Sequence, residues 1–431
     1  MRNHIPVVFR DWRDWPNPKK KLLKVFVPNA EAELEEKCLI CLDEIYGGSP
    51  PRKAVNRMYQ ELYLATGMGF APHYLLAAKL ANRCDNTGGF HTVRGCAGNS
   101  FLSFLLGITE TSPLPPHKYC RTCGYTEFVD ASEYASGYDI YCGKHKSDLC
   151  PKCGDALVGD GHNLDDMFFM GEFGDFAPCF IINVPEEVHH QMLSYLAAQG
   201  MMQEGASPKE IDAAEPFGLY IDIIVDQRLS ALRELQKRTG ATIHEIRCED
   251  VDIPAFVEQM DRTPFLRRED HTILQKIRPS CFSDIVKAYG LEYGDGTWIG
   301  NAAELIETVG SKRELIAHRD DVLDTLLRYD VDRRTAVTLS NAARKGRAKK
   351  AFTPERTAML SELGVPAWYL DSMRKIKYLF PKAHSIEITR TLLRLAWYGQ
   401  HFPNDYEEVI RKYREREEAK SAELLFASNE K

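Results

Sequence analysis

The sequence lacks a long apolar run. No stretch of its 431 residues reaches the roughly 18 uninterrupted apolar residues that a membrane-spanning helix needs. Its first residues, MRNHIPVVFRDWRDWPNPKKKLL, have charges and prolines where a signal peptide would need an apolar core. We therefore expect a cytoplasmic protein that has no membrane partner.

The sequence also lacks internal repeats, low-complexity tracts and an overall positive charge. Its 62 acidic and 55 basic residues give a net charge of −7, so any affinity for nucleic acid must come from a local basic surface. Hydrophobic residues make up 44% of the chain and charged residues 27%, which is ordinary for a soluble globular protein. The length predicts two or three domains.

Cysteine, by contrast, is plentiful and clustered. Twelve cysteines without a secretory signal favour thiolate metal binding over disulfides. Cys120 and Cys123 form one CxxC pair, Cys150 and Cys153 form a second, and a glycine follows each pair. Two such pairs predict a closed, tetrahedral zinc site with a structural role. The surrounding segment, 113–161, is polar and has little hydrophobic patterning, so it needs such a site to fold.

Other metal-ligating residues fit less well. His117, Cys142 and His145 are possible substitutes in the zinc site, but their spacing is poorer. Cys38 and Cys41 form another CxxC pair, one turn apart in an amphipathic helical pattern. Packing in a core explains that pair better than a metal site does.

Two further stretches suggest binding of an anion or a cation. Asp222 lies in YIDIIVD, a run typical of a buried strand, where a carboxylate needs a cation, a metal or a hydrogen-bond partner. In TVRGCAGNS, Arg94 and Gly95 precede a helix that we expect to begin at Asn99 or Ser100. Backbone amides, a helix dipole and an arginine together suit a phosphate, although a plain turn with a helix N-cap explains the same residues.

Positive charge is concentrated between residues 331 and 384. This stretch has twelve lysines and arginines against four acids, a balance of +8. It predicts a surface for nucleic-acid backbone phosphates, although charge runs are often only solvated surface. The predicted nucleic-acid contacts are Arg344, Lys345, Arg347, Lys349 and Lys350. In KIKYLFPKAH, where basic and aromatic residues alternate, the predicted nucleotide contacts are Lys375, Lys377, Lys382 and His384.

These residues, in this order, resemble the alpha subunit of PolC-type DNA polymerase III, a C-family replicative polymerase. TVRGCAGNSF is similar to the family's GSRGSVGSSF, and PLPPHKYCRTC is similar to its PLPPHYVCPNC. GTWIGNAAELI, RDDV, RKGRAKKAFTPE and VPAWYLDSMRKIKYLFPKAH follow the family's fingers pattern. The resemblance extends from about Val27 to Tyr406.

The resemblance implies a mostly helical α+β fold. It predicts a polymerase palm remnant, built on a nucleotidyltransferase-like mixed sheet with an inserted zinc module, and then an all-α fingers domain. The expected segments are an N-terminal extension and helix (1–52), a palm-like domain (53–230) with the zinc module at about 113–161, a fingers-like domain (231–406) and a charged tail (407–431).

The resemblance also implies a role for Asp222. The family's palm holds two magnesium ions between three aspartates, and Asp222 falls on the third. Cys179 and Ile181 stand at the positions of the other two. Magnesium prefers oxygen ligands, which neither a thiol nor an isoleucine offers, so we expect zinc as the structural ion and no magnesium. Nearby acids that could rebuild a site are Asp165, Asp166, Glu172, Asp175 and Asp226.

Further departures from the family point the same way. The family has a thumb and more palm between CFIINV and LYIDIIV, where this chain has only a short connector. We also expect the chain to start after the family's OB-fold, phosphatase-like and exonuclease domains and to end before its duplex-binding and clamp-binding regions. Glu387, in KAHSIEI, adds a negative charge where the family would bind the incoming nucleotide.

Three hypotheses follow. The first is a catalytically inactive, shortened polymerase homologue that binds DNA or associates with replication proteins. The second is an active DNA-directed nucleotidyltransferase with rearranged carboxylates, which needs at least two acids within about 4 to 5 Å of Asp222. The third is an interaction protein whose basic stretch is only surface.

Overall fold

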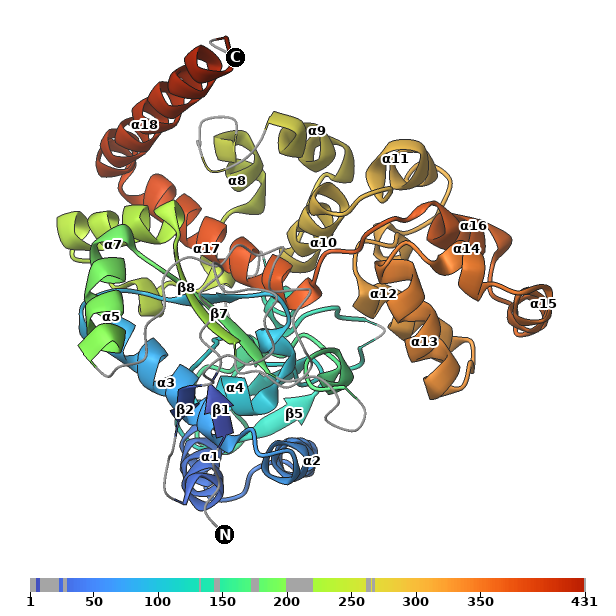
Figure 1. Ribbon diagram of the computed structural model, residues 1–431, viewed down its shortest axis with the longest axis horizontal. Helices are drawn as coiled ribbons and strands as arrows, with labels where there is room; N and C mark the ends of the chain where they lie inside the picture. Colours follow the sequence, from blue (N-terminus) through green and yellow to red (C-terminus); the bar gives the residue numbers. More distant parts are fainter. Residues whose placement is uncertain are drawn as a thin grey trace. The chain divides into compact units, whose positions relative to one another are not determined.

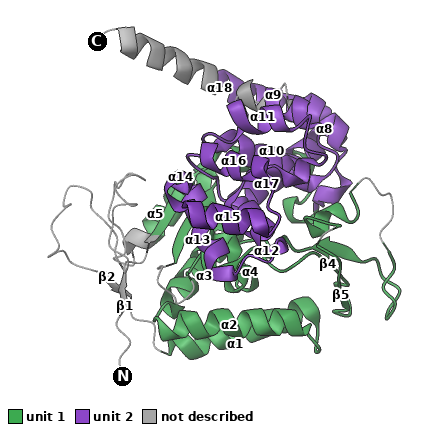
Figure 2. Cartoon of the chain, turned by 90° about the vertical axis from the view of Figure 1, so that its right-hand side faces the viewer, with its two compact units in different colours: residues 1–245 green, residues 246–431 purple. Residues whose placement is uncertain are grey.

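The computed structural model describes residues 5–7, 23–25, 29–131, 133–142, 148–171, 178–198, 220–260, 265 and 268–429. The chain forms two compact units, residues 1–245 and 246–431 (Figure 2). The described residues are mostly helical with small sheets, an α+β composition as the sequence predicts (Figure 1). No helix within these ranges has the length and apolar character needed to cross a membrane.

Unit 1 begins with helices that build one side of its core. Its helices before the central sheet are α1 (Ala30–Tyr46), α2 (Arg52–Gly67), α3 (Ala71–Asn86) and the short α4 (Phe101–Leu105). In α1 an apolar or aromatic residue recurs every fourth position from Leu34 to Tyr46, and these side chains are buried. This single apolar stripe explains why α1 packs with one face against α3 and α2.

The central sheet of unit 1 has the order β3-β7-β8. β3 (Thr92–Arg94) pairs antiparallel with β7 (Cys179–Val184), and β7 pairs in parallel with β8 (Tyr220–Val225). Helix α5 (Glu186–Ala198) follows β7, and α7 (Gln227–Thr239) follows β8. Phe180, Ile182 and Ile223 lie on one face of this sheet and belong to the main hydrophobic core of the unit.

A second, smaller sheet has the order β5-β4-β6. The central strand β4 (His117–Tyr119) pairs antiparallel with both β5 (Thr126–Phe128) and β6 (Val158–Asp160). A separate pair, β1 (Ile5–Val7) with β2 (Leu23–Val25), lies near the N-terminus. The small sheet carries the cysteine pairs on the turns that precede β5 and β6.

Unit 2 is helical. Its helices are α8 (Ile253–Met260), α9 (Arg268–Ile277), α10 (Phe282–Tyr293), α11 (Ala303–Leu305), α12 (Arg319–Arg328), α13 (Arg333–Arg344), α14 (Ala348–Ala351), α15 (Pro354–Glu362), α16 (Ala367–Lys375), α17 (Lys382–His401) and α18 (Pro403–Asn429). Most side chains of α17 are buried, and α10, α8 and α18 pack against it. α12 and α13 pack against each other and are joined by a four-residue connection.

The compact units do not coincide with the segments expected from the sequence. The expected boundary after residue 230 falls inside α7, and the observed division follows Glu245. Helix α7 belongs to unit 1 because it packs against α5 and β7. Its buried residues include Leu229, Leu232 and Leu235. The expected charged tail begins within α18.

Candidate metal and nucleic-acid sites

The three positions that the resemblance assigns to metal-binding aspartates lie on adjacent strands. In β7, Cys179 and Ile181 are two residues apart, so their side chains leave the same face of the sheet. Ile181 in β7 is directly opposite Asp222 in β8. On the other side of β7, Ile181 is directly opposite Arg94 in β3. Arg94, Ile181 and Asp222 therefore form one row across the sheet.

This row lies on the more open face of the sheet. Cys179, Ile181 and Asp222 are partly exposed, whereas Phe180 and Ile182, between them in β7, are completely buried. The strand predicted around Asp222 is present as β8, but its carboxylate is partly exposed rather than fully buried, because it is on the face opposite the core. The row offers one carboxylate, one thiol and one hydrocarbon side chain, a set that does not suit magnesium.

Acidic residues near the row in sequence have other partners. Asp226 caps the first turn of α7 and forms an ion pair with Arg228 at 2.6 Å. Burial alone would raise the pKa of Asp226, but the charges of Arg228 and Arg94 outweigh burial and hold that pKa below its usual value. Asp165 caps the turn at Asp166–Phe168, and Asp166 accepts a hydrogen bond from Gln60 at 2.8 Å.

Two other acids proposed to rebuild a metal site, Glu172 and Asp175, lie outside the described residues. Among the side chains that the structure does describe, no group of three or more metal ligands includes Asp222. The geometric requirement of the second hypothesis, two acids beside Asp222, is therefore not met by Asp165, Asp166 and Asp226.

The glycine loop after β3 leads to α4, where the sequence suggested a phosphate. The structure instead places the carboxylate of Glu61, from α2, at the start of this helix. It accepts hydrogen bonds from the amides of Phe101 at 2.8 Å and Leu102 at 3.2 Å and from the Ser100 hydroxyl at 2.7 Å. Two amides at the start of this helix thus already donate to an anion of the same chain, and the role of Ser100 in binding a phosphate stays a prediction.

Glu61 is a site residue that the sequence analysis missed. It is fully buried, and the Arg57 guanidinium, one turn earlier in α2, donates to its carboxylate at 2.5 Å. Its sequence signal is a glutamate on the apolar face of α2, between the buried Met58 and Leu62. Gly95 keeps a positive φ of 72° in the turn after Arg94, and Arg94 itself is exposed.

The four cysteines of the two CxxC pairs come together. All four sulfur atoms lie within 4.8 Å of one another, with Cys120 Sγ 3.4 Å from Cys153 Sγ and Cys123 Sγ 3.5 Å from Cys150 Sγ. A zinc ion with four thiolates at about 2.3 Å would hold the sulfurs about 3.8 Å apart, so the donor set and its size fit a structural zinc ion. These residues could bind a structural metal such as zinc.

The two cysteine turns have the same local hydrogen-bond pattern. The amide of Gly124 donates to the Cys120 carbonyl, and the amide of Gly154 donates to the Cys150 carbonyl, both at 2.9 Å. Gly124 has a φ of 68°, and a β-carbon there would come within 1.9 Å of the Tyr46 carbonyl oxygen, so only glycine fits.

Backbone amides also act on the sulfurs. Burial works to raise the pKa of the Cys150 thiol, but the amides of Cys153 and Lys152 and the neighbouring thiols lower it to about 6. A thiol that loses its proton this readily is a good metal ligand.

The proposed substitutes for these cysteines are placed elsewhere or are not described. The imidazole of His117 packs against Phe128 and Tyr46, and its Nδ1–H donates to the Pro115 carbonyl at 2.8 Å. Burial lowers the pKa of His117 to about 4, so this ring is a neutral core residue. Cys142 is described but does not belong to the four-sulfur group, and His145 lies outside the described residues.

The predicted nucleic-acid contacts lie at the end of α13 and on α14. Arg344 is partly exposed, and the rest of the set, Lys345, Arg347, Lys349 and Lys350, is exposed. Within the described residues, the side chains of Arg347, Lys349 and Lys350 have no acidic partner. This segment, 344–350, is therefore a cluster of solvent-facing positive charge, which we call the basic segment.

The predicted nucleotide contacts are more varied. Lys375 donates to the Gly300 carbonyl at 2.7 Å, and Lys377 lies 3.4 Å from Asp295 but stays 73% exposed. Lys382 is partly exposed at the start of α17. His384 is buried, with its ring stacked on Phe380 at 4.8 Å between centroids. These residues belong to unit 2, whereas Arg94 and Asp222 belong to unit 1.

Glu387, three residues after His384, is also buried in α17. Arg390 and Arg394, further along the same helix, are buried polar residues as well. The negative charge noted in the sequence is therefore carried by a buried side chain.

Comparisons with known proteins agree with the resemblance noted in the sequence. Residues 32–199 match the family described as the bacterial DNA polymerase III alpha NTPase domain. DNA polymerase III PolC-type from Lacticaseibacillus paracasei is 26% identical over 490 aligned residues, covering 90% of this chain and 33% of that protein. The protein of the same name from Thermotoga maritima is 26% identical and covers 89% of this chain and 35% of the relative.

The chain thus spans about a third of the length of the curated relatives it matches. The alignment with the Streptococcus thermophilus protein of the same name is 491 residues long, more than the whole 431-residue chain, so it includes positions where this chain has no residue. This chain is a homologue of the alpha subunit of PolC-type DNA polymerase III.

Proposed function

We propose that this PolC-type homologue is catalytically inactive and acts as a nucleic-acid-binding or replication-associated protein in the cytoplasm. The observation that carries the proposal is the row across the central sheet. The position beside Asp222 is occupied by Ile181, and Cys179 lies two residues away on the same face. One carboxylate remains where the resemblance implies three.

The loss matters because of the chemistry of phosphoryl transfer. Magnesium dehydrates reluctantly and is held through carboxylates and substrate phosphates, so a lone carboxylate is a weak site. Transfer of a nucleotidyl group depends almost wholly on positioning and on neutralising charge with metal ions. A sheet that cannot hold the two ions keeps the polymerase architecture without its reaction.

The basic segment supports the DNA-binding part of the proposal. Arg347, Lys349 and Lys350 are exposed and unpaired within the described residues, so they are available for phosphates. The relatives are named as DNA polymerases, which makes DNA the partner we propose. The four cysteines would hold a structural zinc ion in unit 1 and take no part in any reaction, because all four ligands of a tetrahedral ion come from the protein.

The test compares binding with synthesis on one substrate. The purified chain is mixed with a fluorescent primed template, and its binding is followed by anisotropy while primer extension is followed on a gel with magnesium or manganese. We expect binding that weakens as salt rises and no extension with either metal. Extension that disappears in Asp222→Ala would overturn the proposal.

A variant with two added carboxylates tests whether the missing aspartates are what prevents metal binding at this sheet. In the double variant Cys179→Asp with Ile181→Asp, three carboxylates would share the face, and we expect Mn²⁺ binding by electron paramagnetic resonance that the wild type lacks. The matched control is Cys179→Ser with Ile181→Val, which changes the same positions without adding a charge. If the aspartate variant folds but binds no more Mn²⁺ than the control, the row is not the remnant of a metal site.

A further inference from the structure

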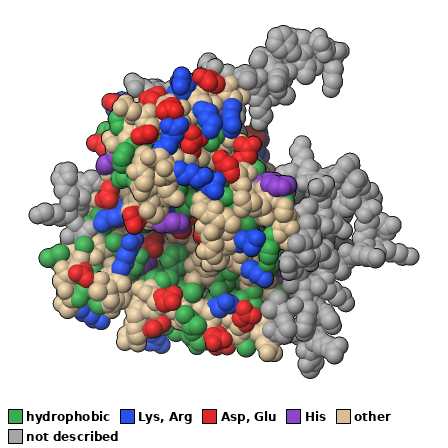
Figure 3. Space-filling view, turned by 90° about the vertical axis from the view of Figure 1, so that its left-hand side faces the viewer, with side chains coloured by type: hydrophobic (Ala, Val, Ile, Leu, Met, Phe, Trp, Pro, Cys, Tyr) green, Lys and Arg blue, Asp and Glu red, His purple; other side chains and the backbone are tan. Residues whose placement is uncertain are grey.

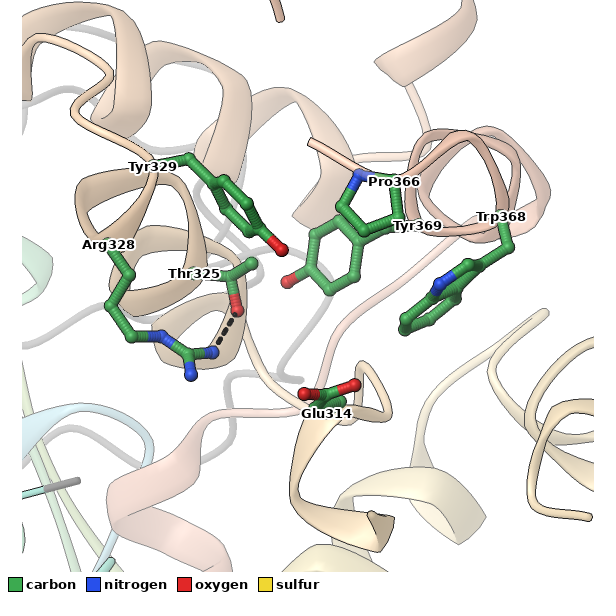
Figure 4. A pocket seen from close by; sticks show the side chains of 7 residues that line it. All are labelled: Glu314, Thr325, Arg328, Tyr329, Pro366, Trp368 and Tyr369. Carbon is green, nitrogen blue, oxygen red and sulfur yellow. Dashed lines mark hydrogen bonds between the residues drawn. The ribbon is translucent and has the colours of Figure 1, made fainter. Parts of the chain in front are cut away.

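Unit 2 contains a cavity that no residue of the basic segment lines. It has a volume of about 250 Å³ and lies between the C-terminal end of α12, the turn at Lys312–Glu314 and the start of α16. Figure 4 shows Tyr329 and Trp368 on opposite sides of this cavity, with Tyr369 between them and Glu314 facing it from below. A cavity with aromatic side chains on two sides suits a flat ring.

Some polar groups that line this cavity make no hydrogen bond to the described part of the chain. Among the described residues, the Glu314 carboxylate, the Trp368 indole N–H and the Tyr329 hydroxyl have no hydrogen-bond partner. Arg328 makes one such bond, from its guanidinium to the Thr325 hydroxyl at 3.0 Å, and the residue is otherwise exposed. Tyr369 differs, since it is buried and donates to the Asp321 carbonyl at 3.1 Å.

We propose that this cavity binds an unpaired guanine base. The inference rests on the proposed nucleic-acid binding and extends it to a second site that reads a base instead of a phosphate. The aromatic walls would stack on the ring, a contact that every base can make. The two charged groups would then choose among bases.

The choice of guanine follows from its edges. Guanine presents two neighbouring donors, at N1 and N2, which a carboxylate such as Glu314 can accept together. It also presents two neighbouring acceptors, O6 and N7, which an arginine such as Arg328 commonly reads. Adenine lacks the pair of donors, and thymine has a single one. An isolated phosphate would meet the negative charge of Glu314, which argues against a simple anion site.

Base recognition here requires a base that is not already paired. The N1 and N2 donors of guanine are used in Watson–Crick pairing, so a duplex cannot offer them to Glu314. A guanine in single-stranded DNA and a free guanine nucleotide both present this edge. The experiment must therefore separate these two sources.

Tryptophan fluorescence provides the measurement, because stacking of a base on Trp368 quenches its emission. The protein is titrated with a dT oligonucleotide that carries one central dG, with the same oligonucleotide carrying dI or dA instead, and with dGMP alone. Trp368→Phe identifies which part of the signal comes from this residue, since four other tryptophans are present. We expect the dG strand to bind about tenfold more tightly than the dI strand, which lacks the N2 donor.

Glu314→Gln supplies the matched change, because it keeps the shape of an exposed side chain and removes its charge. We expect it to abolish the preference for dG over dI and leave binding of a plain dT strand unchanged. Quenching by dGMP alone, at similar affinity, would identify a free nucleotide as the ligand. Equal affinity for dG, dI and dA, or quenching that persists in Trp368→Phe, would overturn the inference.

This result is independent of the test of the proposed function. Loss of charge in the basic segment should weaken all strands equally, whereas loss of Glu314 should affect only strands that contain dG. If the chain bound no DNA but dGMP still quenched Trp368, the proposed function would fail and the base site would stand.

Discussion

At the scale of single residues, Glu61 shows how a buried charge can be fixed by local donors. Its carboxylate accepts hydrogen bonds from two backbone amides in the first turn of α4, from the Ser100 hydroxyl and from the Arg57 guanidinium. A buried carboxylate is costly unless it is paired and hydrogen-bonded, and each of these groups offsets part of that cost. Glu61 thereby joins α2 to the start of α4, which follows the glycine loop after β3.

We expect Glu61→Gln to lower the free energy of unfolding by about 3 kcal/mol, because it leaves the partly buried Arg57 charge without its carboxylate partner. Denaturant unfolding followed by circular dichroism measures the change. The control is Glu36→Gln on the exposed side of α1, which should change the stability by less than about 0.5 kcal/mol. Equal stability of Glu61→Gln and the wild type would show that the carboxylate is not needed to hold α4.

At the scale of elements, the cysteine turns are small structures with few apolar contacts. The cluster of buried hydrophobic residues around them consists of Ile140, Tyr141 and Leu157 beside the sulfurs of Cys120 and Cys150. So small a core cannot compensate for the conformational entropy of a segment this polar. A bound zinc ion would supply the missing stabilisation, because metal binding contributes directly to folding free energy.

We therefore expect about one zinc ion per chain by mass spectrometry of the metal content, and close to none in Cys153→Ser. The variant should also unfold at a lower temperature, because the two turns lose their common ligand. Cys41→Ser is the matched control, since Cys41 belongs to the other CxxC pair, in α1, and lies outside the four-sulfur group. Zinc that is lost from Cys41→Ser and retained in Cys153→Ser would place the metal in α1 instead.

The elements also show how far the sequence could predict the site. The cysteine cluster followed from spacing, because each CxxC turn is formed by residues next to one another. The row of Arg94, Ile181 and Asp222 could not be predicted from pattern alone, because a register between strands depends on the whole packed sheet. The capping of α4 by Glu61 was missed for a similar reason, since its partners lie about 40 residues away in the chain.

At the scale of the whole molecule, charge is distributed unevenly along the chain. The net charge is −7, yet residues 331–384 have a balance of +8. On the face shown in Figure 3, acidic and basic side chains are interspersed, without a broad area of one sign. Because the net charge of the chain is negative, we expect attraction to DNA to come from a few phosphate contacts of the basic segment, and salt should screen it readily.

The basic segment gives this statement a measurable form. We expect Lys349→Glu with Lys350→Glu to weaken DNA binding and to reduce the slope of log affinity against log salt concentration by about 2, because each phosphate contact that is lost removes roughly one released counterion. The control, Lys37→Glu with Lys237→Glu, makes the same change of net charge at two exposed lysines of α1 and α7. If binding depended only on net charge, both variants would lose affinity equally. A reduced slope in the first variant alone would instead assign the contacts to the basic segment, whereas an unchanged slope there would mean that DNA binds to another surface.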